Sequence, residues 1–178
     1  MKHVVFPTFE LHPVNPGGAG VLISYAARLL AEAGHRVTVL CDFPDVEVAR
    51  ANALLAAAPP RAGSVRAVSA TAVGGGALPT FASAFDAHSE GFAAALVHLH
   101  REDPIDLIEF PEYAGMGFAS LRDRLVTGAL ADVSMVVRVH GSLELINRAQ
   151  GTPADPQLTR MYRLERLSMR MADALLVP

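Results

Sequence analysis

The sequence contains little cysteine and little lysine. Cys41 is the only cysteine among 178 residues, so the chain cannot form an internal disulfide. Its place at the end of an apolar run is typical of a buried free thiol, which fits best with a reducing cytoplasm. Lys2 is the only lysine among the 15 basic residues. This excludes Schiff-base chemistry at an interior lysine and the GxxxxGK[ST] phosphate loop of simple ATPases and GTPases.

Long apolar runs and a segregated basic patch are also missing. The longest apolar runs, such as 135–137 and 174–177, are far shorter than the roughly 20 residues of a membrane-spanning helix. Only three apolar residues lie between His3 and Pro7, too few for the apolar stretch of a signal peptide. Charged residues make up 19% of the chain and the net charge is -3. A nucleic-acid-binding surface therefore has no electrostatic support, and no nucleic-acid partner is expected.

Hydrophobic residues make up 51% of the sequence, enough to bury a sizeable core in a single domain over residues 1–178. Strand-like apolar runs alternate with segments whose apolar residues recur at three and four positions, as in helices. We expect strands at 3–9, 37–41, 65–69, 105–110, 133–139 and 174–177, and helices at 21–33, 45–58, 84–101, 117–126 and 156–171. This pattern predicts an α/β fold: a doubly wound, Rossmann-like parallel sheet in a three-layer αβα arrangement, with strand order 3-2-1-4-5-6.

The helical periodicity also predicts details of individual segments. The first helix should end at Gly34, and Asp45 should cap the second one. Residues 74–79 should form a loop. The residues expected on the buried face of the first helix are Leu22, Tyr25, Ala26, Leu29 and Ala33.

A glycine-rich loop precedes the first helix. Doubly wound sheets bind ligands beyond the carboxyl ends of their strands, where the strand order reverses, so the loops after strands one, four and five are of interest. The first of them carries Gly17, Gly18 and Gly20. Glycines let the backbone approach a ligand closely, while the unpaired amides and the helix dipole attract an anion. A diphosphate would suit this position.

Two other interpretations of these glycines stay open. Gly18 and Gly20 satisfy the first half of the GxGxxG dinucleotide fingerprint, and Asp42 is placed to hold a ribose. Ile23, however, stands where that motif has its third glycine or alanine. In the other interpretation, the glycines only relieve a strand-to-helix turn.

The loops after strands four and five carry the best candidate side chains. Glu112 and Tyr113 lie beyond the break that Pro111 imposes, so Glu112 is either a functional residue or a solvated carboxylate at the start of the next helix. His140 follows a buried strand and precedes Gly141, which places it to hydrogen-bond a ligand in the same crevice as the glycines. The alternative is a structural histidine bonded to neighbouring backbone groups.

No metal site is indicated. His98 and His100 lie two positions apart on a predicted helix, so their imidazoles point to different faces and cannot share one ion.

Five segments follow one another in a characteristic order and spacing. They are Pro16–Gly20, Ala33–Leu40, Asp106–Tyr113, Arg138–Gly141 and Glu165–Pro178. Together they span nearly the whole chain and resemble the amino-terminal half of the family-4 retaining glycosyltransferases, which have the GT-B fold. In that family, two Rossmann-like domains face each other across a cleft. The resemblance implies that this chain is the acceptor-side domain.

The same resemblance implies roles for individual residues. Gly17, Gly18 and Gly20 would bind the donor diphosphate, and His140 would be the catalytic residue against the donor sugar. The residues implied to contact the acceptor are Asn15, Glu112 and Tyr113. No metal and no organic cofactor are implied.

The family's carboxyl-terminal domain, with its paired glutamates, is absent from this sequence, which stops at Pro178. We therefore expect a domain fragment, inactive alone, of an enzyme that transfers a hexose from a nucleoside-diphosphate sugar. The acceptor would be a sugar, a lipid-linked sugar or a small molecule. The full-length protein would be cytoplasmic, either free or peripheral to the inner face of the membrane. The alternatives are a nicotinamide-dependent oxidoreductase domain and a non-catalytic Rossmann-like binding module.

Overall fold

The computed structural model describes residues 1–15, 17–74 and 84–177, which form one sheet with helices on both faces. None of the described helices is long and apolar enough to cross a membrane. In chain order the elements are β1 (His3–Thr8), α1 (Gly18–Glu32), β2 (Arg36–Cys41), α2 (Asp45–Ala57), β3 (Ser64–Ser69), α3 (Ala70–Gly74), α4 (Ala84–Glu102), β4 (Leu107–Pro111), the 3-10 helix η1 (Tyr113–Gly115), α5 (Phe118–Thr127), β5 (Ser134–Arg138), α6 (Leu143–Ala149), α7 (Pro156–Met171) and β6 (Ala174–Leu176).

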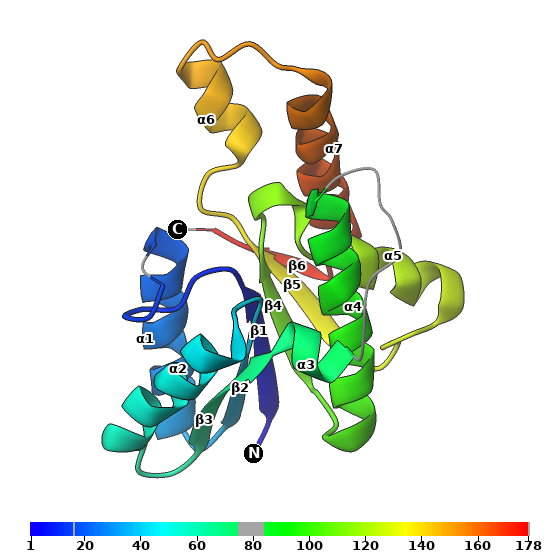
Figure 1. The fold of residues 1–178 in the computed structure, drawn as a ribbon. Coiled ribbons are helices and arrows are strands. Elements are labelled where there is room, and N and C mark those ends of the chain that lie inside the picture. The colour runs from blue at the N-terminus through cyan, green and yellow to red at the C-terminus, as the bar shows by residue number, and fades with distance from the viewer. Residues whose placement is uncertain (16, 75–83, 178) are drawn as a thin grey trace.

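The six strands run parallel in the order β3-β2-β1-β4-β5-β6 (Figure 1). Val4 of β1 pairs with Val37 of β2 on one side and with Leu107 of β4 on the other. The predicted strand order and the Rossmann-like α/β class are confirmed. Because the order reverses beside β1, the carboxyl ends of β1 and β4 flank the crevice in which such sheets bind ligands.

Helices on both faces complete the three layers (Figure 1). Successive side chains of a strand point to opposite faces, so Val4 and Phe6 of β1 belong to the core beneath α1 and α2, whereas Val5 belongs to the core beneath α3, α4 and α5. Cys41 lies in the first of these cores and is fully buried. Burial raises the pKa of the Cys41 thiol to about 12, so the predicted buried free thiol is confirmed.

The buried face of α1 is not the predicted one. Tyr25 and Leu29, expected in the core, are 66% and 70% exposed, and Leu22 is exposed as well. The buried residues are mostly small: Gly20, Ile23, Ala27 and Ala31. Small side chains let the helix approach the sheet closely. The orientation of α1 therefore follows from close packing and not from burial of its largest apolar residues.

Other differences concern element ends and short helices. The sequence did not predict α3, η1 or α6, each of which has seven residues or fewer. Asp45 is the first residue of α2, and Pro44 holds the cap position expected for Asp45. Of the predicted loop 74–79, Gly74 ends α3, and residues 75–79 lie outside the described part of the chain.

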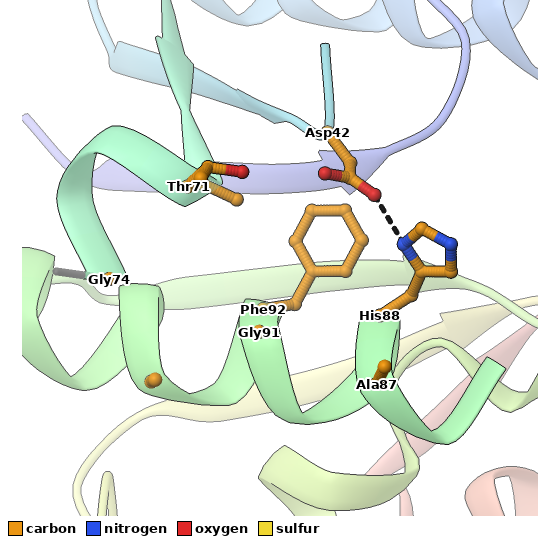
Figure 2. A pocket seen from close by; sticks show the side chains of 9 residues that line it. Asp42, Thr71, Gly74, Ala87, His88, Gly91 and Phe92 are labelled. Atoms are coloured by element: carbon orange, nitrogen blue, oxygen red, sulfur yellow. Dashed lines mark ion pairs between the residues drawn. The ribbon is translucent and has the colours of Figure 1, made fainter. Parts of the chain in front are cut away.

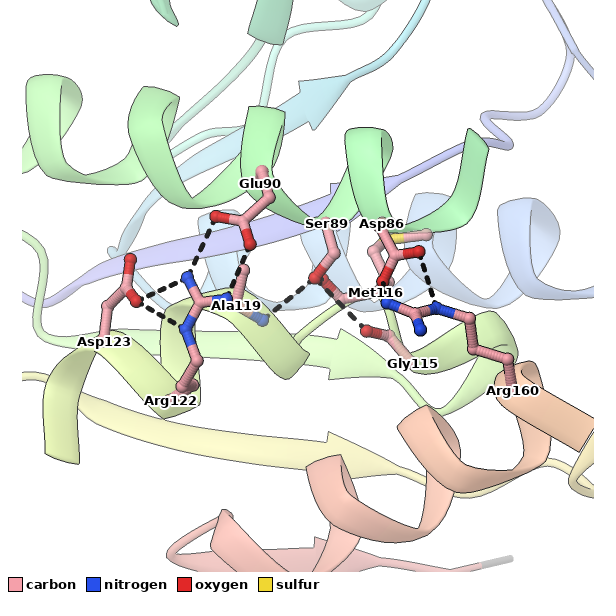
Figure 3. Close-up of polar contacts among 9 residues, drawn as sticks. All are labelled: Asp86, Ser89, Glu90, Gly115, Met116, Ala119, Arg122, Asp123 and Arg160. Atoms are coloured by element: carbon pink, nitrogen blue, oxygen red, sulfur yellow. Dashed lines mark hydrogen bonds and ion pairs between the residues drawn. The ribbon is translucent and has the colours of Figure 1, made fainter. Parts of the chain in front are cut away.

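Polar side chains on one face of α4 fix it to the segments around η1 (Figure 3). The buried Ser89 hydroxyl donates to the Met116 carbonyl at 3.0 Å and accepts from the Ala119 amide at 2.9 Å. Two ion pairs flank it, Asp86 with Arg160 of α7 and Glu90 with Arg122 of α5. These contacts hold the loop after β4 in place at the carboxyl end of the sheet.

Candidate functional site

A cavity of about 700 Å³ opens at the carboxyl ends of β1, β4 and β5. The structure brings five residues singled out from the sequence into its lining: Asn15, Gly18, Glu112, Tyr113 and His140. The loops after strands one, four and five therefore meet at one site, as the sheet topology requires. Gly17 and Gly20 are not part of this lining and lie instead against Glu10.

The Glu10 carboxylate lies beside the start of α1. The Gly20 amide donates to Glu10 Oε2 at 3.1 Å. A Cβ on Gly17 would overlap this carboxylate, and a Cβ on Gly20 would lie 2.9 Å from the backbone nitrogen of Leu11. At Gly20, in the first turn of α1, the nearby backbone of residues 10 and 11 leaves no room for a side chain. At Gly17 only the end of the flexible Glu10 side chain would have to move.

Gly18 is in a different environment. Nothing lies within 4 Å of the position that its Cβ would take. Within the described part of the chain, neither its amide nor that of Ala19 donates to a protein acceptor, and the first turn of α1 carries no acidic residue. Two amides that have no acceptor among the described residues, together with the positive end of the helix dipole, therefore lie at the lining of the cavity, where an anion is favoured.

Glu112 holds the loop that follows β5. Its side chain is only 2% exposed, so the solvated carboxylate considered from the sequence is wrong. Oε1 accepts the backbone amides of His140 and Gly141, both at 2.7 Å, and Oε2 lies 3.2 Å from His140 Nδ1. One buried carboxylate thus fixes both the backbone and the imidazole of His140.

The remaining predicted residues lie on the outer wall of the cavity. The His140 side chain is 33% exposed, and Tyr113 is 47% exposed at the start of η1. Asn15 donates from Nδ2 to the Phe9 carbonyl at 2.9 Å, which ties the glycine loop back to the end of β1. All three side chains remain accessible to a bound molecule.

A second buried carboxylate, Glu165 of α7, supports the same loops from below. Its Oε1 accepts the amides of Ala114 at 3.1 Å and Leu143 at 3.2 Å, while Oε2 is buried with no hydrogen-bond partner in the described structure. Ala114 has a φ of 55°, in the left-handed region that alanine rarely adopts, and its amide is held there by this bond. Burial raises the pKa of Glu165, against the opposing effect of its amide bonds.

The raised pKa of Glu165 makes stability depend on pH. The folded state holds this proton more tightly than the unfolded state, so the free energy of unfolding falls as pH rises above the ordinary glutamate range.

The variant Glu165→Gln tests this pH dependence, because glutamine keeps one oxygen for the amides and has no charge to bury. We expect its stability relative to wild type to increase from pH 4 to pH 7 in urea unfolding. Glu102→Gln, at a side chain 66% exposed, should show a much flatter difference. A pH-independent difference for Glu165→Gln would contradict this account.

Asp42 and His88 form a pair that sequence analysis did not find (Figure 2). Asp42 follows β2 and contacts His88 Nδ1 on α4, and the Phe9 ring packs edge-on against the imidazole at 5.0 Å. His88 and Phe9 also line the large cavity. Asp42 is thus engaged by a histidine, and Ile23 is buried in the core. The structure gives no support to the dinucleotide interpretation of Asp42.

Some of the unpredicted residues left a signal in the sequence. Glu165 lies four residues after Met161 and three before Ser168 on the buried face of α7, and a carboxylate at such a position indicates a buried polar contact. Glu10 and His88 left no comparable signal, because their partners are distant in sequence or are backbone amides.

Comparison with protein families agrees with this geometry. The sequence model of Glycosyltransferase Family 4 matches residues 16–178, which is most of the chain. No curated protein matches it. The match begins at the glycine loop and includes β4, β5, Glu112 and Glu165. The chain belongs to glycosyltransferase family 4.

Proposed function

We propose that this chain is the acceptor-side domain of a retaining glycosyltransferase that moves a hexose from a nucleoside-diphosphate sugar to an acceptor hydroxyl. The observation that carries the proposal is that the free amides at the start of α1 and the His140 side chain face one cavity. Membership in family 4 supports transfer of a sugar.

The glycine loop binds the donor diphosphate in this proposal. The amides of Gly18 and Ala19 hydrogen-bond its oxygens, while Gly20, in the first turn of α1, lets the helix pack against residues 10 and 11. The diphosphate gains negative charge as its bond to the anomeric carbon breaks. Hydrogen-bond donors that are already oriented toward that charge stabilise the transition state without further reorganisation.

His140 contacts the donor sugar and orients it while positive charge develops at the anomeric carbon. Asn15 and Tyr113 face the acceptor, which is a sugar, a lipid-linked sugar or a small molecule. Glu112, implied on the same side by the family resemblance, acts on this wall through its bonds to His140 and Gly141. The proposal includes no metal and no organic cofactor.

Glycosyl transfer by the intact natural protein tests the proposal directly. The protein is incubated with a panel of radiolabelled nucleoside-diphosphate sugars and a mixture of sugar, lipid-linked and small-molecule acceptors. Labelled product with retained anomeric configuration supports it. Hydride exchange with NAD or NADP, without transfer from any donor, would favour the oxidoreductase alternative instead.

Glu10 gives a prediction about donor affinity. Its carboxylate accepts the Gly20 amide, next to the Gly18 and Ala19 amides that should receive the diphosphate, so the two negative charges repel each other. Glu10→Gln can keep the bond from the Gly20 amide and removes that charge. We expect UDP and ADP to bind this variant more tightly by about 1 kcal/mol, or roughly fivefold in Kd, in calorimetric titration.

Glu32→Gln is the matched control, because Glu32 is the last residue of the same helix, at its opposite end. That variant should bind both nucleotides like wild type. Equal or weaker binding by Glu10→Gln would show that the diphosphate does not lie at this helix start.

A further inference from the structure

The chemistry of the buried Glu112 carboxylate determines which nitrogen of His140 carries a proton. An ionised carboxylate can only accept hydrogen bonds. Oε1 is occupied by two backbone amides at 2.7 Å, and Oε2 faces His140 Nδ1 at 3.2 Å. For this contact to be a hydrogen bond, Nδ1 must carry the hydrogen.

The other ring nitrogen is free for a ligand. In a neutral imidazole whose Nδ1 is protonated, Nε2 carries a lone pair and accepts hydrogen bonds. No group in the described part of the chain bonds to His140 Nε2, and the side chain lines the cavity and is 33% exposed. In its neutral form the ring therefore presents an acceptor, rather than a donor, to a molecule in the cavity.

We propose that Glu112 is a positioning residue that holds His140 in the Nδ1–H tautomer, so that Nε2 accepts a hydrogen bond from a hydroxyl of the bound sugar. The identity of that hydroxyl as part of the donor rests on the proposed function. The tautomer itself rests only on the contacts of Glu112. This tautomer makes the site selective, because Nε2 favours a ligand that offers a hydroxyl or amine hydrogen over one that offers an oxygen without a hydrogen.

The structure separates this role from a purely structural one. Holding the loop requires only Oε1, which accepts both backbone amides. The contact between Oε2 and Nδ1 adds nothing to the backbone and acts on the imidazole alone. In other proteins, a carboxylate that bonds one ring nitrogen of a functional histidine fixes the tautomer and the orientation of the ring.

Glu112→Gln tests the proposal because it changes one atom. A glutamine that keeps its oxygen on the two amides turns its NH2 toward Nδ1, and an NH2 group donates. Nδ1 must then accept, and the hydrogen moves to Nε2. Two-bond 1H–15N spectra of the imidazoles, recorded on the 178-residue chain in alkaline buffer where the rings are neutral, distinguish a protonated ring nitrogen from a bare one. His140→Gln assigns the signals.

We expect an Nδ1–H ring at His140 in the wild type and an Nε2–H ring in Glu112→Gln. Glu109→Gln is the matched control, since Glu109 is also buried on β4 but bonds Arg138 instead, so the His140 ring signals should not change. An Nε2–H ring in the wild type would overturn the proposal, even if the variant failed to fold. The same tautomer in the wild type and a folded Glu112→Gln would also overturn it.

Kinetics of the intact natural protein then connect the tautomer to the reaction. Loss of a partner that orients a functional imidazole should lower kcat by roughly 10- to 100-fold in Glu112→Gln, with a small change in donor KM. A normal kcat with a switched tautomer would show that no sugar hydroxyl donates to Nε2. If the wild type transfers no sugar at all, the proposed function fails, while the ring spectra still decide the tautomer.

Discussion

Replacing His140 with alanine is expected to lower kcat for glycosyl transfer by about 100- to 1000-fold, the typical loss for one preorganised polar contact to a reacting group. The nucleotide Kd should change far less, because the proposed contact is to the sugar and not to the diphosphate. Initial rates over a range of donor concentrations, with a separate titration of the nucleotide, distinguish these two effects in the intact natural protein.

The structure also predicts how little this substitution should disturb the fold. The His140 side chain is one-third exposed, and Glu112 keeps its bonds to the two backbone amides when the imidazole is removed. His98→Ala provides the control, because His98 is a half-exposed histidine on α4 that pairs only with Glu102 in the described structure. Near-normal kcat in a folded His140→Ala protein would make His140 a structural histidine and remove it from the mechanism.

Gly18→Val should have an effect of similar size at the other side of the cavity. Open space surrounds the position of the new Cβ, so the chain should fold normally. The branched side chain would nevertheless stand over the free amides of Gly18 and Ala19 and keep a diphosphate away from them. We expect weaker nucleoside-diphosphate binding together with a loss of kcat/KM on the order of 100-fold.

Gly20→Val is the informative comparison, since it lies two residues further along the same helix. Its Cβ would meet the backbone of Glu10 and Leu11, so the main effect should be destabilisation by about 1–3 kcal/mol from overpacking. Thermal unfolding measures this directly. If Gly18→Val bound UDP as tightly as wild type, the amides at the start of α1 would not be the diphosphate site.

The fold was predictable from the sequence because its strongest signals are local. Apolar runs of strand length alternate with helical periodicity, and right-handed connections then leave few possible strand orders. The orientation of α1 was not predictable in this way. Periodicity favours a buried face that contains large apolar residues such as Leu29, but Ala27 and Ala31 are the residues that pack against the sheet. Close packing depends on the shapes of both surfaces, and the sequence of one helix does not show the surface that it meets.

The candidate site was predictable in location but not in its contacts. The topology placed the glycine loop, Glu112 and His140 at one edge of the sheet before any contact was known. It did not show that Glu112 is buried against His140, because a carboxylate after a proline looks like a solvated residue in sequence. Glu10 was missed because its partners are backbone amides, which carry no residue signature.

The helix α6 stands apart from the core, because none of its residues is buried. Polar contacts attach it to α7, including the bond from Asn147 to the Tyr162 hydroxyl and the pair of Glu144 with Arg166. Segments held by few apolar contacts open with a smaller free energy than the sheet requires to unfold. The amides of α6 should therefore exchange with solvent deuterium through local opening, while the His140 backbone just before it stays anchored to Glu112. The cavity lining at His140 and Gly141 is thus held by a buried carboxylate, and the chain becomes loosely attached only beyond these lining residues.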